Sequence, residues 1–129
     1  MDERGFFKLR NIDKKYYTID LREKFGIEGP VCDGYGHHKN CNWFVQEIES
    51  SDIDYGVEQL ESTVKQLEIK GYPVDKIFLI INRFKSKKFQ GKHGVIHVTG
   101  SKTPYMIRGK KIYIVKNNDI KEELEWRFF

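Results

Sequence analysis

The sequence has no alanine, only two cysteines and no long apolar run. Its longest apolar run, "IFLII" at 77–81, is far shorter than the roughly 20 residues that a membrane-spanning helix needs. The N-terminal "MDERGFFKLR" has no basic segment followed by an apolar one, so it does not resemble a secretory signal. We therefore expect a cytoplasmic protein without a membrane segment, in which Cys32 and Cys41 are free or metal-bound rather than bridged.

The 129 residues also contain no internal repeat, low-complexity tract or long linker. Hydrophobic residues make up 39% of the chain and charged residues 33%, a balance typical of a soluble globular protein rather than a disordered one. A chain of this length can form one core, so we expect a single domain over residues 1–129.

The charges are distributed unevenly along the chain. The segment from Glu47 to Glu61 contains acids and no base, whereas residues 83–116 contain Lys and Arg and no acid. An acidic region beside a basic one suits a protein that holds a metal ion next to a polyanion. Solvated loops with ordinary lysines are an equally good explanation of the same composition.

A long amphipathic helix is the clearest element. Its apolar residues recur at the spacing of one helix face, and Gly71 and Pro73 then provide a stop signal, which predicts a helix over 53–70. The residues expected to face the core are Ile53, Val57, Leu60, Val64 and Leu67.

Alternating or continuous apolar runs indicate several strands. The continuous run at 76–84 predicts a strand buried on both faces, which completes a βαβ crossover with the preceding strand and helix. The other predicted elements are strands at 15–21, 30–36, 41–49 and 94–99, a hairpin at 104–115, helical turns at 20–26, a basic loop at 85–94 and a helix from Asp119. We therefore expect an α/β (α+β) fold, a mixed central sheet with flanking helices.

The stretch "CDGYGHHKNCNWFVQEIE" (32–49) concentrates groups that can carry chemistry. Its cysteines and histidines lie too close together for a usual tetrahedral zinc site, which draws pairs of ligands from separate segments. A disulfide across the hairpin would close a short loop, but a reducing compartment disfavours it. The residues concerned are Cys32, His37, His38 and Cys41.

Three carboxylates of the same stretch indicate a different kind of site. Glu47 and Glu49 are two residues apart and share one face of their strand, and a turn centred near His37 and His38 would bring Asp33 to about their level. Carboxylates placed together repel one another, and a hard cation such as Mg²⁺ or Mn²⁺ relieves the repulsion. The alternative is that they are ordinary surface acids.

An Asp on one strand and Glu-x-Glu on the next, followed by an amphipathic helix and a buried strand, resembles the PD-(D/E)xK nuclease superfamily. The resemblance covers about residues 30–84. It implies a restriction-endonuclease-like (Holliday-junction-resolvase-like) fold and a Mg²⁺- or Mn²⁺-dependent DNA endonuclease. In this resemblance the metal is held by Asp33, Glu47 and the Ile48 carbonyl, and the catalytic residues are Asp33, Glu47, Glu49 and Gln59.

The chain departs from the family pattern at two positions. Cys32 stands at the usual proline, and Glu49 stands at the usual lysine, which positions or activates the attacking water. Lys65 could replace that lysine, and Glu3 or Glu23 could supply a further acid. Because Glu-x-Glu occurs in active sites and would also occur in a decayed one, the alternative is a non-catalytic nucleic-acid-binding or assembly protein that keeps the fold. A stand-alone binding module of another kind is the third interpretation.

The basic segment after the buried strand indicates where DNA would bind. Loops at strand ends can reach a phosphate backbone, and nothing in the sequence resembles a helix-turn-helix or a zinc finger. Sequence-specific reading of the major groove is therefore not indicated. The nuclease resemblance implies DNA, branched or single-stranded, as the partner, and family analogy adds a homodimer. The expected phosphate contacts are Lys85, Lys87, Lys88 and Lys92.

Replacing Lys85, Lys87 and Lys88 together with alanine is expected to weaken DNA binding and to flatten its salt dependence, because each lost phosphate contact removes a contribution from counterion release. Fluorescence anisotropy with a labelled DNA at several salt concentrations measures both quantities. An unchanged salt slope would place the DNA-binding surface elsewhere on the protein.

Overall fold

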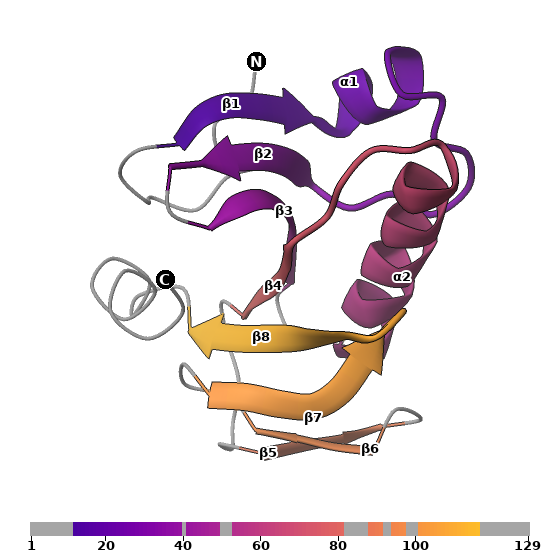
Figure 1. Ribbon diagram of the computed structural model, residues 1–129. Helices are drawn as coiled ribbons and strands as arrows, with labels where there is room; N and C mark the ends of the chain where they lie inside the picture. The colour runs from indigo at the N-terminus through magenta and orange to yellow at the C-terminus, as the bar shows by residue number, and fades with distance from the viewer. Residues whose placement is uncertain are drawn as a thin grey trace.

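The computed structural model describes residues 12–39, 41–49, 53–81, 88–91, 94–97 and 101–116. Over these ranges the chain forms a mixed α/β fold with a six-stranded mixed sheet and two helices, which confirms the predicted mixed α/β class with a mixed central sheet (Figure 1). Neither helix is long and apolar enough to cross a membrane. The predicted helix from Asp119 lies outside the described residues, as does Glu3.

The central sheet consists of β1 (Ile12–Tyr17), β2 (Gly34–His38), β3 (Asn42–Glu49), β4 (Lys76–Ile81), β7 (Ser101–Ile107) and β8 (Lys110–Lys116). Its strand order is β1-β2-β3-β4-β8-β7. β2 pairs antiparallel with β1 and β3, β4 lies parallel between β3 and β8, and β7 is antiparallel to β8. A second sheet, formed by β5 (Lys88–Gly91) and β6 (Gly94–His97), lies beside β7 (Figure 1).

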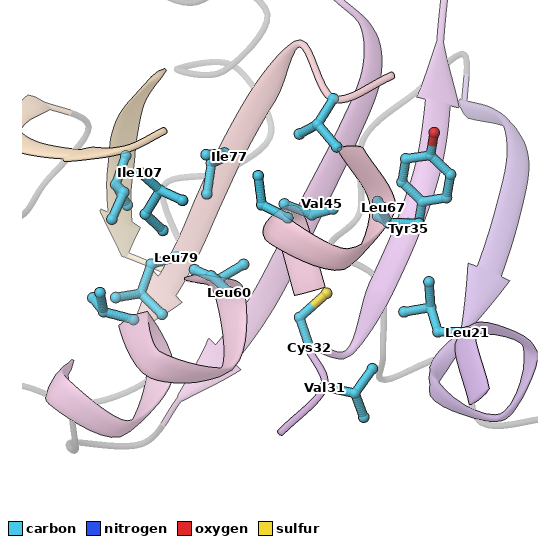
Figure 2. Packing of buried hydrophobic residues seen from close by; sticks show 14 of the residues in the cluster. Leu21, Val31, Cys32, Tyr35, Val45, Leu60, Leu67, Ile77, Leu79 and Ile107 are labelled. Carbon is cyan, nitrogen blue, oxygen red and sulfur yellow. The ribbon is translucent and has the colours of Figure 1, made fainter. Parts of the chain in front are cut away.

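Helix α2 (Ile53–Ile69) covers one face of the central sheet. Its predicted apolar stripe is confirmed, and the stripe residues that are fully buried are Val57, Leu60, Val64 and Leu67. Figure 2 shows Leu60 and Leu67 in one cluster with Val45 of β3 and Ile77 of β4. Burying a leucine side chain stabilises a fold by roughly 2 kcal/mol, so this cluster holds the helix on the sheet.

The predicted βαβ crossover is present as β3–α2–β4, and β4 runs parallel to β3 with Glu47 opposite Leu79. β4 is buried on both faces, as its continuous apolar run predicts. Leu79 lies in the cluster beneath α2, whereas Phe78 packs on the opposite face with Phe44 and Tyr113. The carboxyl ends of two parallel strands therefore meet near the start of α2.

The N-terminal strand ends earlier than the sequence indicates. The predicted strand at 15–21 is wrong beyond Tyr17, because helix α1 (Thr18–Glu23) begins at the next residue. The Asp20 carboxylate accepts the Tyr17 backbone N–H at 2.9 Å, a cap that starts the helix and turns the chain away from the sheet. The predicted helical turns at 20–26 are therefore present but begin earlier.

The predicted hairpin at 104–115 is confirmed as β7 and β8, joined by Arg108 and Gly109. Both turn residues have a positive φ, 49° and 83°, as a two-residue type I′ turn requires. The predicted loop at 85–94 is wrong in part, because Lys88–Gly91 forms a strand paired with β6. Lys88 therefore begins a strand instead of lying in a loop.

Replacing Leu60 with alanine is expected to lower the free energy of unfolding by about 2–5 kcal/mol, because it leaves a cavity between α2 and the sheet. Ile69→Ala, at the end of the same helix where the side chain is 67% exposed, is the control and should change stability by only about 0.5 kcal/mol. Urea titration followed by circular dichroism measures both variants. Equal losses would contradict the packing of α2 on the sheet.

Candidate functional site

The β2–β3 hairpin brings Asp33 level with Glu47. The Asp33 N–H, just before β2, donates to the Gln46 carbonyl at 3.1 Å. The predicted centre of the hairpin turn is wrong, since His38 is still part of β2 and pairs with Asn42. The turn lies further along the chain, and this later position sets Asp33 beside Glu47 instead of near the start of β3.

A hydrogen bond anchors Asp33 to the strand that carries Glu47. Its Oδ2 accepts the Ile48 N–H at 2.8 Å. The N–H and the carbonyl of one residue in an extended strand point to the same side, so the Ile48 carbonyl also faces the Asp33 side of β3. The Cys32 N–H is directed elsewhere and donates to Thr63 Oγ1 on α2 at 2.9 Å. The Asp33 carboxylate and the Ile48 carbonyl can therefore serve one ligand.

Glu47 and Glu49 both lie on the face of β3 that α2 covers. Their Cγ atoms are 3.7 and 2.8 Å from the point where a Cβ on Gly56 of α2 would stand. The Glu47 side chain is only 3% exposed, and Glu49 is half-buried. The alternative interpretation of ordinary surface acids is therefore wrong for Glu47.

The surroundings of Glu47 disfavour its charged form. Burial, followed by the neighbouring charges of Asp33 and Glu49, raises the pKa of Glu47 to about 9. Its Oε1 is buried and has no hydrogen-bond partner among the residues that the structure describes. A divalent cation would supply both the missing partner and a compensating charge, so the oxygen donors at this position fit a hard cation.

Within the described ranges, no group of three or more Asp, Glu, His or Cys side chains has the arrangement of a metal site. The predicted ligand set is sparser than that, because it consists of the Asp33 and Glu47 carboxylates and the Ile48 carbonyl. Mg²⁺ usually keeps several waters and takes one or two carboxylates together with oxygens of its substrate. A Mg²⁺ site at these groups would therefore be an open one rather than a cage of side chains, and the binding of the ion stays a prediction.

Gln59 lies on α2 about one turn beyond Gly56, on the same side of the helix. Its Nε2 donates to the Val31 carbonyl at 3.3 Å, and its Oε1 is buried without a hydrogen-bond partner among the described residues. Gln59 thus holds the segment that leads into Asp33. Lys65 is exposed and lies about two and a half helical turns from Gly56, on the opposite side of α2, so the expected substitute for the missing lysine is wrong.

The zinc and disulfide interpretations of the hairpin are both wrong. Cys32 belongs to the cluster beneath α2, whereas Cys41 belongs to the cluster on the opposite face of the sheet, and both are free. Burial raises the pKa of each thiol to about 12, which disfavours the thiolate that zinc requires. His37 Nδ1 lies 2.8 Å from Asp13 Oδ1 on β1, so its imidazole serves a contact between strands.

Two basic residues of the described part have structural partners. Arg108 and Lys110, at the β7–β8 turn, both pair with Glu68 and tie this hairpin to α2. Of the predicted phosphate contacts, only the backbone of Lys88 is described, and those that lie outside the described residues are Lys85, Lys87 and Lys92. The DNA-binding surface therefore remains a prediction.

Of the two candidate N-terminal acids, Glu23 is exposed at the end of α1.

Sequence reasoning missed Gly56. Its signal was available, because glycine within a helix destabilises it by about 1 kcal/mol relative to alanine and so indicates a packing reason for its presence. In the structure Gly56 is buried where α2 passes close to Glu47 and Glu49. The local pattern could reveal that a glycine was unusual here, but not which side chains it would meet.

Comparison of the chain with protein-family models, curated proteins and solved structures finds no match. The likeness to the nuclease superfamily therefore depends on the Asp33, Glu47 and Glu49 pattern and on the order β2–β3–α2–β4. Since one fold can serve many activities, the function has to be argued from the site itself.

In metal-free protein, stability is expected to fall as the pH rises from about 4.5 to about 9. The folded state raises the pKa of Glu47, so the protonated carboxyl favours the folded protein. This contribution to the free energy of unfolding is complete below the ordinary pKa of 4.5 and is lost as the pH approaches about 9. Glu47→Gln should flatten this slope and stabilise the protein at pH 8. Urea titrations in EDTA across this range measure the effect.

The matched control is Glu58→Gln, which changes an exposed carboxyl on α2 and should leave the slope as in the wild type. Identical stability–pH slopes in the wild type and Glu47→Gln would contradict the burial of the Glu47 carboxyl.

Proposed function

We propose that the protein is a metal-dependent DNA endonuclease with a restriction-endonuclease-like fold, acting on branched or single-stranded DNA. The observation that carries this proposal is the pair formed by Asp33 and Glu47, which lie at the same level of the β2–β3 hairpin. Glu47 is buried, its pKa is raised, and its Oε1 has no hydrogen-bond partner among the described residues. The order of elements supports it, because the helix follows the carboxylate-bearing strand and β4 runs parallel to that strand. A cytoplasmic location and a homodimer are part of the proposal.

The chain's own groups would hold and orient one Mg²⁺ or Mn²⁺ through Asp33, Glu47 and the Ile48 carbonyl. Such a cation, when bound, activates a water and stabilises the charge that develops on the phosphodiester. The hydrogen bond from the Ile48 N–H fixes the Asp33 carboxylate, and α2 excludes bulk water from Glu47. Both effects prepare the oxygen ligands before substrate binds.

Glu49 changes the proton chemistry expected of this family. A lysine at its position would donate hydrogen bonds to the attacking water, whereas an ionised carboxylate only accepts them. Glu49 lies on the same face of β3 as Glu47 and is half-buried, so a water between Glu49 and the phosphodiester remains within its reach. We therefore assign Glu49 the role of a general base that orients the water and accepts its proton.

The second candidate is a nucleic-acid-binding or assembly protein that keeps a decayed nuclease fold. The buried Glu47 argues against it, because its Oε1 is buried without a hydrogen-bond partner among the described residues, and such an oxygen destabilises the folded state. A scaffold that performs no chemistry gains nothing from that arrangement. The cost of retaining Glu47 therefore favours the catalytic proposal.

Incubation with branched, nicked and single-stranded DNA in Mg²⁺, Mn²⁺ or EDTA tests the proposal, and cleavage should depend on the metal. Glu47→Gln should abolish cleavage because it removes a ligand charge, while circular dichroism and DNA binding remain close to those of the wild type. Glu58→Gln is the control and should cleave normally.

Glu49→Lys restores the usual residue of the family and should retain cleavage with an altered pH profile. Cleavage by this variant alone would indicate a decayed wild-type site, and binding without any cleavage would favour the second candidate.

A further inference from the structure

Helix α2 comes close to Glu49 and Glu47 at Gly56. A Cβ placed on this residue would stand 2.8 Å from Glu49 Cγ, 2.8 Å from Leu79 Cδ1 and 3.7 Å from Glu47 Cγ. Side-chain carbons are essentially never found closer than 3.0 Å to such a Cβ. Any residue other than glycine would therefore displace Glu49, Leu79 or the helix itself.

Backbone conformation does not explain this glycine. Gly56 lies in the first turn of α2, and the glycines with positive φ in the described residues are Gly26, Gly29, Gly71 and Gly109. At a helical position alanine is preferred over glycine, so the local sequence preference opposes Gly56. The remaining reason for glycine is the space that its missing side chain leaves.

Two kinds of neighbour fill that space. Leu79 belongs to the apolar cluster between α2 and the sheet, and its contact with the helix is ordinary core packing. Glu49 is an acid on β3, the strand beside the one that carries Leu79. The Glu49 Cγ and the Leu79 Cδ1 are both 2.8 Å from the point where a Cβ on Gly56 would stand. The Cγ of Glu49 is an apolar methylene, but holding it against the helix also limits where the carboxylate beyond it can lie, which a leucine contact does not do.

We propose that Gly56 is a positioning residue, whose missing side chain lets α2 hold the stem of Glu49 beside Glu47, so that the Glu49 carboxylate reaches a water on the cation that Asp33 and Glu47 would bind. This inference rests on the proposed function. It assigns to α2 the part of a rigid support behind the carboxylates, since groups behind a metal ligand fix its orientation and contribute to affinity. Glu49 is thereby part of the site instead of an acid at its margin.

The test is Mn²⁺ affinity, measured by calorimetry without DNA, together with the melting temperature in EDTA. Gly56→Ala should weaken Mn²⁺ binding about ten-fold or more, the loss typical of removing a support behind a ligand. In a Glu49→Ala background the same change at Gly56 should have no further effect on affinity, because the residue through which it acts is gone. Glu61→Ala, at an exposed position of α2, is the control and should bind Mn²⁺ as the wild type does.

A second pair of variants separates positioning from core packing. Leu79→Val removes the Cδ1 atom that an alanine at position 56 would meet, and leaves Glu49 unchanged. Gly56→Ala combined with Leu79→Val should recover the melting temperature of Leu79→Val alone, while Mn²⁺ binding stays weak. Recovery of both quantities would show that Gly56 serves packing only and would overturn the inference.

The remaining outcomes distinguish this inference from the proposed function. If Gly56→Ala binds Mn²⁺ with the same affinity as the wild type, the role of Gly56 is overturned and the nuclease proposal stays intact. Equal losses from Gly56→Ala in the wild-type and Glu49→Ala backgrounds would show that Gly56 does not act through Glu49. Wild-type protein that binds no Mn²⁺ would remove both proposals.

Discussion

The burial of the Glu47 carboxyl between β3 and α2 is the constraint on which the candidate site depends. An acid in this position destabilises the fold unless its charge or its proton is accommodated, and its pKa is accordingly raised to about 9. The apolar contacts of α2, through residues such as Leu60 and Leu67, offset that cost by holding the helix on the sheet. The core therefore keeps in place a group that would otherwise turn toward water.

The sheet combines a core and a candidate site on one face. Along β3, Val45 belongs to the cluster beneath α2, and Glu47 and Glu49 continue the same face toward the carboxyl end of the strand. β4 is parallel to β3 and ends near the same edge. Ligands of open α/β sheets bind outside the carboxyl ends of parallel strands, and Glu47 and Glu49 are among the last residues of β3 before that end.

The elements with strong local patterns were predictable from the sequence. The spacing of Val57, Leu60 and Val64 was sufficient for α2, and the continuous apolar run was sufficient for a strand buried on both faces. The start of α1 and the turn of the β2–β3 hairpin were not predictable in the same way. Asp20 caps the helix through one specific hydrogen bond, and the position of the turn follows from a register that extends over the whole strand pair.

The sequence by itself determined which faces of α2 and β3 are apolar and which positions carry carboxylates, because side-chain periodicity is a property of neighbouring residues. Only the tertiary structure decided that Cys32 and Cys41 lie on opposite faces of the sheet and that Glu47 is buried. It also decided that Gly56 faces Glu49. These facts depend on contacts between segments far apart in the chain, and a local pattern carries no information about which distant segment will cover it.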